Sequence, residues 1–221
     1  LALYHYAHLP HIFKPQRRID TNVVPGSEEK LDMLQYCVQT LTERGYVFIG
    51  MDHFAKPDDE LSIALKEGFL QRNFQGYSTY ADCDLVAIGV SSIGKIGSTY
   101  SQNERDIDAY YAALDAGHLP IMRGYQLNQD DILRRNIIQD LMCRFSLDYQ
   151  IYESVFGIPF SRYFAAELED MKQLETLGLV RLKPHSLTVT PKGRFLIRNI
   201  AMVFDYHLRH KETKAKYSQT V

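Results

Sequence analysis

The sequence has no tryptophan, only three cysteines and no large excess of charge of either sign. Cys37, Cys83 and Cys143 are odd in number and far apart, which indicates neither a disulfide framework nor a C-x-x-C metal site. We expect three reduced thiols that are mostly buried. The 27 acidic and 25 basic residues nearly cancel, so bulk charge does not suggest a nucleic-acid partner or an acidic membrane surface.

Long apolar runs are missing as well. No stretch of the 221 residues reaches the length of a membrane span, and no cleavable signal is visible. We therefore expect a cytoplasmic protein without a membrane partner, made of one large domain or two small ones. The chain begins with Leu1 rather than Met, inside what reads as a strand over residues 1–6, so we interpret it as a piece of something longer.

Helices and strands are expected to alternate through the first part of the chain. Ser27 is followed by acidic residues and predicts the N-cap of an amphipathic helix that ends at Gly45. A buried strand is expected over residues 46–50, a short helix over residues 58–68 and another buried strand over residues 85–90. This alternation is typical of a parallel α/β sheet.

The glycine-rich segment at residues 89–97 is the first candidate for a binding loop. Its glycines let the backbone take positive φ or approach a ligand closely. Ligands of parallel α/β sheets lie at the carboxyl ends of strands, which here are the loops near His8, His53 and Ile93. We expect these loops to face one cleft; a core strand with a flexible exit loop is the alternative interpretation.

The chain changes character after a helix expected over residues 104–116 and a crossing segment at residues 120–125. We then expect a helix capped by Asn128, helices over residues 149–156 and 161–176, strands over residues 179–182 and 187–190, and a closing helix from Pro191 to about residue 208. This order predicts a mostly helical, winged-helix-like domain over residues 125–221, after a first domain over residues 1–124. Residues 209–216 are basic and polar and read as a frayed end.

Histidines and carboxylates offer a few candidate sites. Asp52 and His53, at a predicted strand end, could form an acid–base pair, half of a metal site or a structural clasp. His5, His8 and His11 would share a face only on a helix, which the neighbouring proline argues against. We therefore expect no metal site.

The arginines read as surface groups. Salt bridges are the simplest interpretation of Arg72 and Arg123, and solvated helix faces are expected for the second-part arginines, namely Arg134, Arg135, Arg194 and Arg198. A winged helix raises DNA binding as an alternative. The helix region before the wing, residues 167–172, is acidic, which argues against nucleic acid.

Several strings together resemble a known family. They are residues 6–10 (YAHLP), 50–55 (GMDHFA), 57–61 (PDDEL), 72–77 (RNFQGY), 89–91 (GVS) with Ile93, 192–194 (KGR) and 197–200 (IRNI). The chain thereby resembles the oxygen-independent coproporphyrinogen III oxidases, which are radical S-adenosylmethionine (radical SAM) enzymes of haem biosynthesis. The related haem chaperones, the alternative, have a serine–asparagine pair in place of Asp52 and His53.

The resemblance implies an α/β fold that begins more than halfway through the enzyme. The chain would supply the last strands and helices of a partial (β/α) radical SAM barrel, followed by the winged-helix-like domain. The family's Cys-x3-Cys-x2-Cys motif, which holds a [4Fe-4S] cluster, is absent here. We therefore expect this chain alone to be inactive, because its cysteines cannot ligate the cluster.

The resemblance also implies site residues and partners. Ala7 and Ile93 match residues that contact S-adenosyl-L-methionine, and Phe74 and Gln75 match a pocket for a second S-adenosylmethionine or the substrate. In the family, a radical derived from adenosylmethionine starts the oxidative decarboxylation of two propionates of coproporphyrinogen III to vinyls, which gives protoporphyrinogen IX. We further expect an electron donor and acceptor, a monomer, and support of the cleft by Asp52 and His53.

Overall fold

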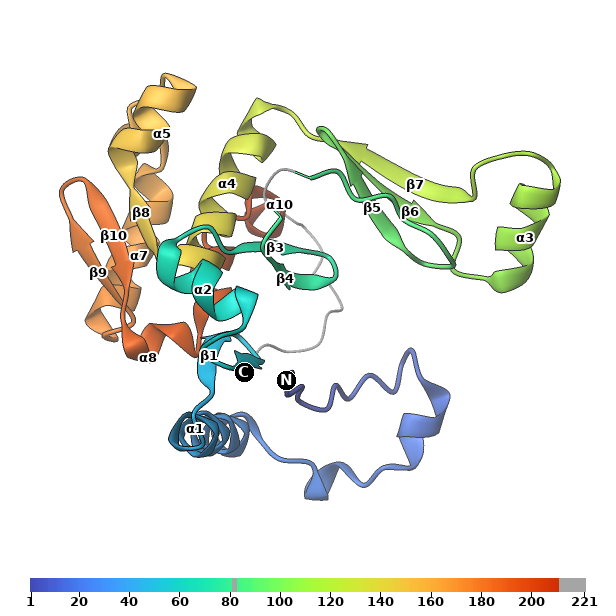
Figure 1. The fold of residues 1–221 in the computed structure, drawn as a ribbon, viewed down its shortest axis with the longest axis horizontal. Coiled ribbons are helices and arrows are strands. Elements are labelled where there is room, and N and C mark those ends of the chain that lie inside the picture. Colours follow the sequence, from blue (N-terminus) through green and yellow to red (C-terminus); the bar gives the residue numbers. More distant parts are fainter. Residues whose placement is uncertain (81–82, 211–221) are drawn as a thin grey trace.

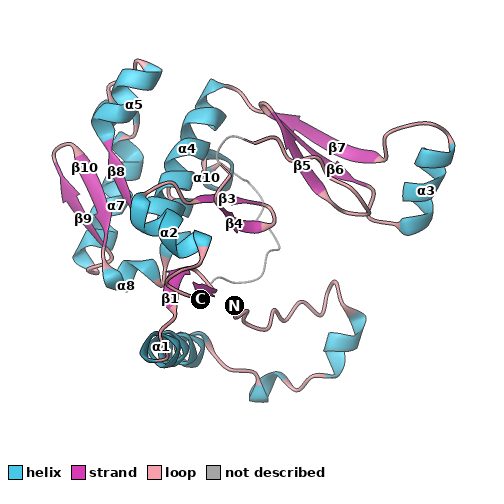
Figure 2. Cartoon of the chain, viewed as in Figure 1, coloured by secondary structure: helices cyan, strands magenta, loops and turns pink. Residues whose placement is uncertain are grey.

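The structure, a computed structural model, describes residues 1–80 and 83–210. It mixes helices with small sheets, as the α/β prediction requires (Figures 1 and 2). In every strand pair of the described residues the two strands run antiparallel. The predicted parallel sheet is therefore wrong. All but the first two residues of the predicted frayed end at 209–216 lie outside the described residues.

The first 26 residues form an extended loop with two short 3-10 helices, η1 (Lys14–Arg18) and η2 (Thr21–Val23). The strand expected over residues 1–6 is reduced to one bridge, between Ala2 and His53. The terminal amino group of Leu1 donates to the carbonyl oxygen of Phe54 at 2.7 Å, which ties the segment to a strand of only three residues. So short a partner cannot pair a six-residue strand.

Helix α1 (Ser27–Glu43) leads into strands β1 (Val47–Gly50) and β2 (His53–Ala55). The predicted helix is confirmed, but Gly26 rather than Ser27 occupies its N-cap. Positive φ at Gly50 (155°) and at Met51 (52°) reverses the chain, so β2 pairs back on β1. Only two residues separate β1 from β2. So short a connection allows antiparallel pairing, whereas parallel pairing would need a long crossover segment.

Helix α2 (Glu60–Glu67) confirms the short predicted helix. The side chain of Asp59 caps it by accepting from the backbone N–H of Leu61, and Gly68 ends it at φ 81°. A hairpin of β3 (Gln71–Asn73) and β4 (Gly76–Ser78) follows. This hairpin carries the aromatic–amide turn that the sequence singles out.

A second sheet forms an arm that extends away from the rest of the molecule (Figure 1). Its strands are β5 (Ile93–Ile96), β6 (Thr99–Asn103) and β7 (Ile121–Gln126), and α3 (Ile107–Asp115) lies at its far end. The buried strand expected over residues 85–90 is wrong. Leu85 makes one bridge to Lys95, while the side chains of Val86 and Ile88 are 69% and 83% exposed. The glycine-rich segment instead supplies β5 itself.

The last part contains α4 (Gln129–Arg144), β8 (Ser146–Asp148), α5 (Tyr149–Phe156), α6 (Phe160–Tyr163), α7 (Ala165–Thr176), β9 (Val180–Lys183), β10 (Ser186–Val189), α8 (Pro191–Arg194), α9 (Ile197–Met202) and α10 (Tyr206–Arg209). The helix capped by Asn128 is confirmed, with a complete capping box. The two strands expected over residues 179–182 and 187–190 are confirmed as β9 and β10, and β8 adds a third strand to their sheet. The prediction of a single closing helix from Pro191 to about residue 208 is wrong. It breaks at Leu196 and again at Asp205, whose side chain caps a new helix.

One hydrophobic core joins both parts of the chain. Ile49 and Leu70 from the first part pack in the same buried cluster as Ile137, Phe160 and Ile200 from the second. Helix α4 lies between them, against α9, β8 and β3. In residues 1–80 and 83–210, no helix is both long and apolar enough to cross a lipid bilayer.

Candidate functional site

The β3–β4 hairpin presents Phe74 and Gln75 at its tip. The side chain of Asn73 accepts from the backbone N–H of Gln75 at 2.8 Å and so shapes the turn. Gly76 has φ 134°, and a Cβ there would lie 3.4 Å from Nε2 of His53. The Phe74 side chain is 53% exposed, with its ring edge-on to Tyr100 at a centroid distance of 5.3 Å.

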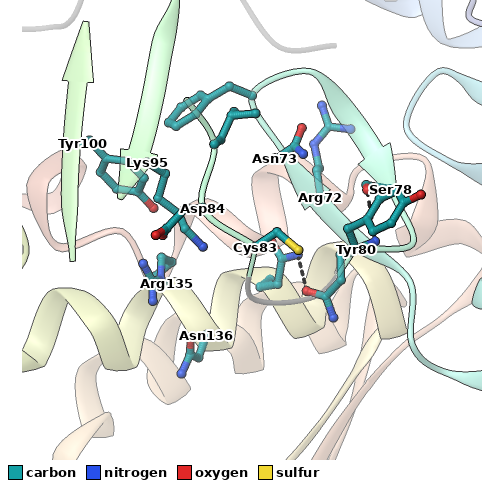
Figure 3. A pocket seen from close by; sticks show the side chains of 14 residues that line it. Arg72, Asn73, Ser78, Tyr80, Cys83, Asp84, Lys95, Tyr100, Arg135 and Asn136 are labelled. Carbon is teal, nitrogen blue, oxygen red and sulfur yellow. Dashed lines mark hydrogen bonds between the residues drawn. The ribbon is translucent and has the colours of Figure 1, made fainter. Parts of the chain in front are cut away.

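A pocket of about 600 Å³ opens between this hairpin, the arm and α4. Its lining, shown in Figure 3, comprises Gln71, Arg72, Asn73, Phe74, Ser78, Tyr80, Cys83, Asp84, Leu85, Lys95, Tyr100, Arg135, Asn136 and Gln139. The side-chain amides of Gln139 and Gln71 form a hydrogen bond of 3.0 Å, which joins α4 to β3. Pockets of this size hold a drug-sized ligand or part of a larger one.

The pocket lining carries more positive than negative charge. Among the lining residues that the structure describes, Arg72, Lys95 and Arg135 are the cations and Asp84 is the carboxylate. Within the described chain, none of these three cations forms a salt bridge, and Nη1 of each arginine is buried without a hydrogen-bond partner. The described residues thus give no carboxylate partner for the salt bridge predicted for Arg72. Its guanidinium instead lies over the ring of Tyr77, 4.8 Å from the centroid.

Asp52 and His53 form a hydrogen-bonded pair close to Gly76 of the β3–β4 hairpin. Nδ1 of His53 lies 2.7 Å from a carboxylate oxygen of Asp52, and both side chains are largely buried in the β1–β2 turn. The His53 ring meets Tyr77 edge-on at 5.3 Å, and the Tyr77 hydroxyl donates to the carbonyl oxygen of Met142. Burial raises the pKa of Tyr77, so its hydroxyl stays protonated. The pair is therefore linked through Tyr77 to Arg72.

The two positions matched to an adenosylmethionine contact lie on different segments of the chain. Ala7 is exposed on the first loop, where its carbonyl oxygen accepts from the side chain of Gln16 at 3.1 Å. Ile93 lies in β5, two residues before Lys95 and therefore on the same face of the strand. The described lining residues of the pocket start at Gln71, so the loops near Ala7 and His53 do not line it. The roles of Ala7 and Ile93 stay predictions.

Sequence reasoning missed several polar residues whose surroundings only the fold reveals. Arg135 and Gln139 are one turn apart on α4 and line the pocket, although solvated faces were expected there. The Arg134 residue is only 9% exposed, and its guanidinium donates to the Glu167 carboxylate at 2.9 Å. Arg194 donates to the carbonyl oxygen of Phe48 at 2.9 Å.

Two other predictions about arginines have opposite outcomes. Arg198 is exposed, as predicted. Within the described residues Arg123 pairs with no carboxylate. Its guanidinium donates instead to the side-chain oxygen of Gln102 at 2.6 and 2.9 Å. The sequence does hold one indication of buried arginines. They lie three to four residues from apolar positions, which places them next to the apolar face of their helix.

The donor set of this chain does not fit an iron–sulfur cluster. No group of three or more His, Cys, Asp or Glu side chains within residues 1–80 and 83–210 could hold a metal ion. All three cysteines are free, and only Cys143 is buried; Cys37 is half-buried and Cys83 is exposed. The prediction of mostly buried thiols is therefore wrong.

Known proteins resemble this chain over most or all of its length. The HemN C-terminal domain family matches residues 127–196. The oxygen-independent coproporphyrinogen III oxidase of Pseudomonas aeruginosa is 49% identical over 208 residues, which are 94% of this chain and 45% of the relative. The Escherichia coli K12 protein of the same name is 46% identical over 221 residues, covering 100% of this chain and 48% of the relative.

A solved structure agrees with these sequence matches. The structure reported as "Coproporphyrinogen III oxidase (HemN) from Escherichia coli is a Radical SAM enzyme" superposes with a TM-score of 0.89 and 47% identity. The match covers 94% of this chain and 48% of that structure. The chain thus spans about half the length of the relatives it matches.

These matches define first a class: an α/β chain that carries a HemN C-terminal domain and has the fold of part of a radical SAM enzyme. Identity at this level runs along the whole chain. The chain is thus similar to the C-terminal portion of the oxygen-independent coproporphyrinogen III oxidases.

Proposed function

We propose that this chain is the C-terminal portion of an enzyme that oxidatively decarboxylates two propionates of coproporphyrinogen III to vinyl groups. The observation that carries the proposal is the match of all 221 residues at 46% identity to an oxidase of this name. The TM-score of 0.89 with a radical SAM enzyme supports the same fold for both. Haem chaperone and nucleic-acid roles have no comparable support.

The finer architecture belongs to this proposal. Residues 1–124 would supply the last strands and helices of a partial barrel, and residues 125–221 a winged-helix-like domain that covers its open side. The three-stranded sheet β8–β10–β9 with α7 before it supports the second description. The enzyme would be a cytoplasmic monomer that uses an electron donor and an electron acceptor and binds no nucleic acid.

In this proposal the chain positions and shields rather than transfers protons. Adenosylmethionine, bound with the help of Ala7 and Ile93, would supply the radical chemistry, and the cluster would be held outside this chain. Phe74 offers an apolar surface beside the pocket, and Gln75 offers a single amide. Asp52 and His53 would hold the β1–β2 turn in place behind Tyr77.

A chimera in which this chain replaces the matching half of the Escherichia coli oxidase tests the proposed role of Gln75. Its side chain is exposed and makes no hydrogen bond within the described residues. Gln75→Ala should therefore leave the melting temperature unchanged while it lowers vinyl-product formation about tenfold or more.

Gln39→Ala is the matched control for this substitution. Gln39 is also a side-chain amide, but it lies on α1, where it donates to the carboxylate of Glu43. The control should leave turnover unchanged. Equal turnover of the Gln75→Ala and Gln39→Ala chimeras would remove Gln75 from the site. Tight haem binding without any vinyl product would support the chaperone alternative instead.

A further inference from the structure

We propose that Arg135, with Lys95, forms a carboxylate-binding subsite in the pocket between the β3–β4 hairpin, the arm and α4. The ligand class is a carboxylate carried on a planar, largely apolar body. This inference rests on the proposed function, in which the substrate carries propionates, and it assigns one of them to a place in this chain.

The charge of the pocket is the first support. Among the described lining residues, Arg72, Lys95 and Arg135 stand beside one carboxylate, Asp84. The same described residues hold no salt bridge to any of the three cations. A carboxylate oxygen of Asp84 already accepts from the backbone N–H of Gly97 at 2.8 Å. Positive charge is thus left over for an anionic ligand.

The guanidinium of Arg135 is the second support. Its Nη1 atom is buried and has no hydrogen-bond partner among residues 1–80 and 83–210, although buried polar groups in proteins are nearly always paired. Arg135 is fixed on α4, a 16-residue helix with a complete capping box. A carboxylate entering the pocket would compensate a charge that the described residues leave uncompensated.

Nearby residues form the wall that the rest of the ligand would contact. Phe74, Tyr80 and Tyr100 supply aromatic surface, and Phe74 meets Tyr100 edge-on at 5.3 Å. Lys95 and Tyr100 face each other as cross-strand partners of β5 and β6, which puts the ammonium and the ring on one side of the sheet. Figure 3 shows Lys95 and Arg135 reaching toward Asp84 from β5 and α4.

The same chemistry favours a propionate over the other candidate carboxylate. Adenosylmethionine carries a carboxylate too, but it also carries a sulfonium cation and an ammonium, which a pocket with excess positive charge disfavours. An inorganic oxyanion would use the cations but not the aromatic wall. A tetrapyrrole with propionate side chains uses both.

Binding of coproporphyrin III, the stable oxidised form with four propionates, tests the proposal. We expect fluorescence titration to show binding to the chain, and Arg135→Gln to weaken it about tenfold to a hundredfold, the range for a lost charge-assisted hydrogen bond. Arg135→Lys should recover part of the loss. The tetramethyl ester, which has no carboxylate, should bind the parent chain as weakly as coproporphyrin binds Arg135→Gln.

Arg181→Gln is the matched control, because Arg181 is an exposed arginine on β9, outside the pocket lining. It should bind coproporphyrin like the parent chain. Lys95→Met provides a second test on an independent element if Arg135→Gln does not fold. Three results would overturn the proposal. They are equal affinity of Arg135→Gln and Arg181→Gln for coproporphyrin, equal affinity of the parent chain for the acid and the ester, and displacement of coproporphyrin by millimolar phosphate or by adenosylmethionine.

The outcome also separates this inference from the proposed function. If Arg135→Gln binds coproporphyrin normally while the chimera makes the vinyl product, the subsite is wrong and the function stands. If Arg135→Gln loses binding while the folded, cluster-loaded chimera makes no vinyl product, the subsite stands and the function is wrong.

Discussion

A single glycine decides how closely α8 packs against the strands β9 and β10. Gly193, in α8, lies so near the residue before β9 that an added Cβ would lie 2.0 Å from the carbonyl oxygen of Leu179 and 2.9 Å from a methyl group of Val189. The close approach involves backbone, which cannot rotate away as a side chain can. This explains the glycine in a string that the sequence singles out only by resemblance.

Gly193→Ala should therefore lower the free energy of unfolding by about 1–3 kcal/mol or more. Urea denaturation followed by circular dichroism measures it. Gly26→Ala is the control, because no atom lies within 4 Å of a Cβ at Gly26, which occupies the N-cap of α1 with negative φ. Equal stability of the two variants would contradict the close packing at Gly193.

Cys143 links one buried thiol to the pH dependence of stability. Burial raises the pKa of Cys143 from its ordinary value of 9.0 to about 12. The unfolded chain therefore ionises first, so the stabilisation is complete below pH 9 and is lost as the pH rises toward 12. Between these pH values, ionisation of this thiol should raise the equilibrium constant of unfolding by up to roughly tenfold per pH unit.

Cys143→Ala should flatten that dependence, whereas Cys83→Ala, at an exposed thiol, should leave it unchanged. Urea midpoints measured from pH 8 to pH 10.5 provide the comparison. The variant will be less stable overall because it leaves a small cavity. The buried tyrosines, whose pKa values are also raised, contribute equally in all variants. Parallel curves for Cys143→Ala and the parent would rule out the buried-thiol explanation.

At the scale of elements, a buried ion pair joins α4 to α7. Nη1 of Arg134 donates to Glu167 at 2.9 Å and to the carbonyl oxygen of Phe204 at 3.1 Å, while its Nε donates to Asp130 at 2.8 Å. Two helices and the turn between α9 and α10 therefore meet at one guanidinium. Removing one partner of a buried pair leaves an uncompensated charge, which costs far more than losing an exposed pair.

Glu167→Gln should lower the free energy of unfolding by about 3 kcal/mol, the lower end for a broken buried pair, because Asp130 still faces Arg134. Glu169→Gln is the control on the same helix. It breaks the pair with Lys172, in which both side chains are about two-thirds exposed, and should cost at most about 1 kcal/mol. A loss at Glu167 no larger than that at Glu169 would contradict the burial of this network.

Elements were predictable where the signal is local, and strand pairing was not. Capping residues at Asp59 and Asn128 correctly mark helix starts, since a cap depends on a few neighbouring residues. The β1–β2 reversal depends on positive φ at Met51, a residue type that gives no warning of it. The apolar run at residues 85–90 predicts burial only if a partner surface is present, and its side chains are largely exposed in the described chain.

At the scale of the whole molecule, the resemblance was predictable and the site geometry only in part. The strings at residues 50–55 and 72–77 resemble the oxidases, and the matched relatives bear out that resemblance. The expectation of one cleft formed by three loops depended on a parallel sheet that the described strands do not form. Pocket residues on α4, such as Arg135, could not be found locally because they are 63 positions from Arg72 in sequence.

Product analysis of the chimera tests the central claim most directly. This chain would replace the matching half of the Escherichia coli oxidase, and the loaded cluster would be verified by its absorbance before the assay. We predict conversion of coproporphyrinogen III to a product that has lost two carboxyl groups and gained two vinyls, detected by mass spectrometry. A folded, cluster-loaded chimera that cleaves adenosylmethionine but forms no vinyl product would contradict the claim.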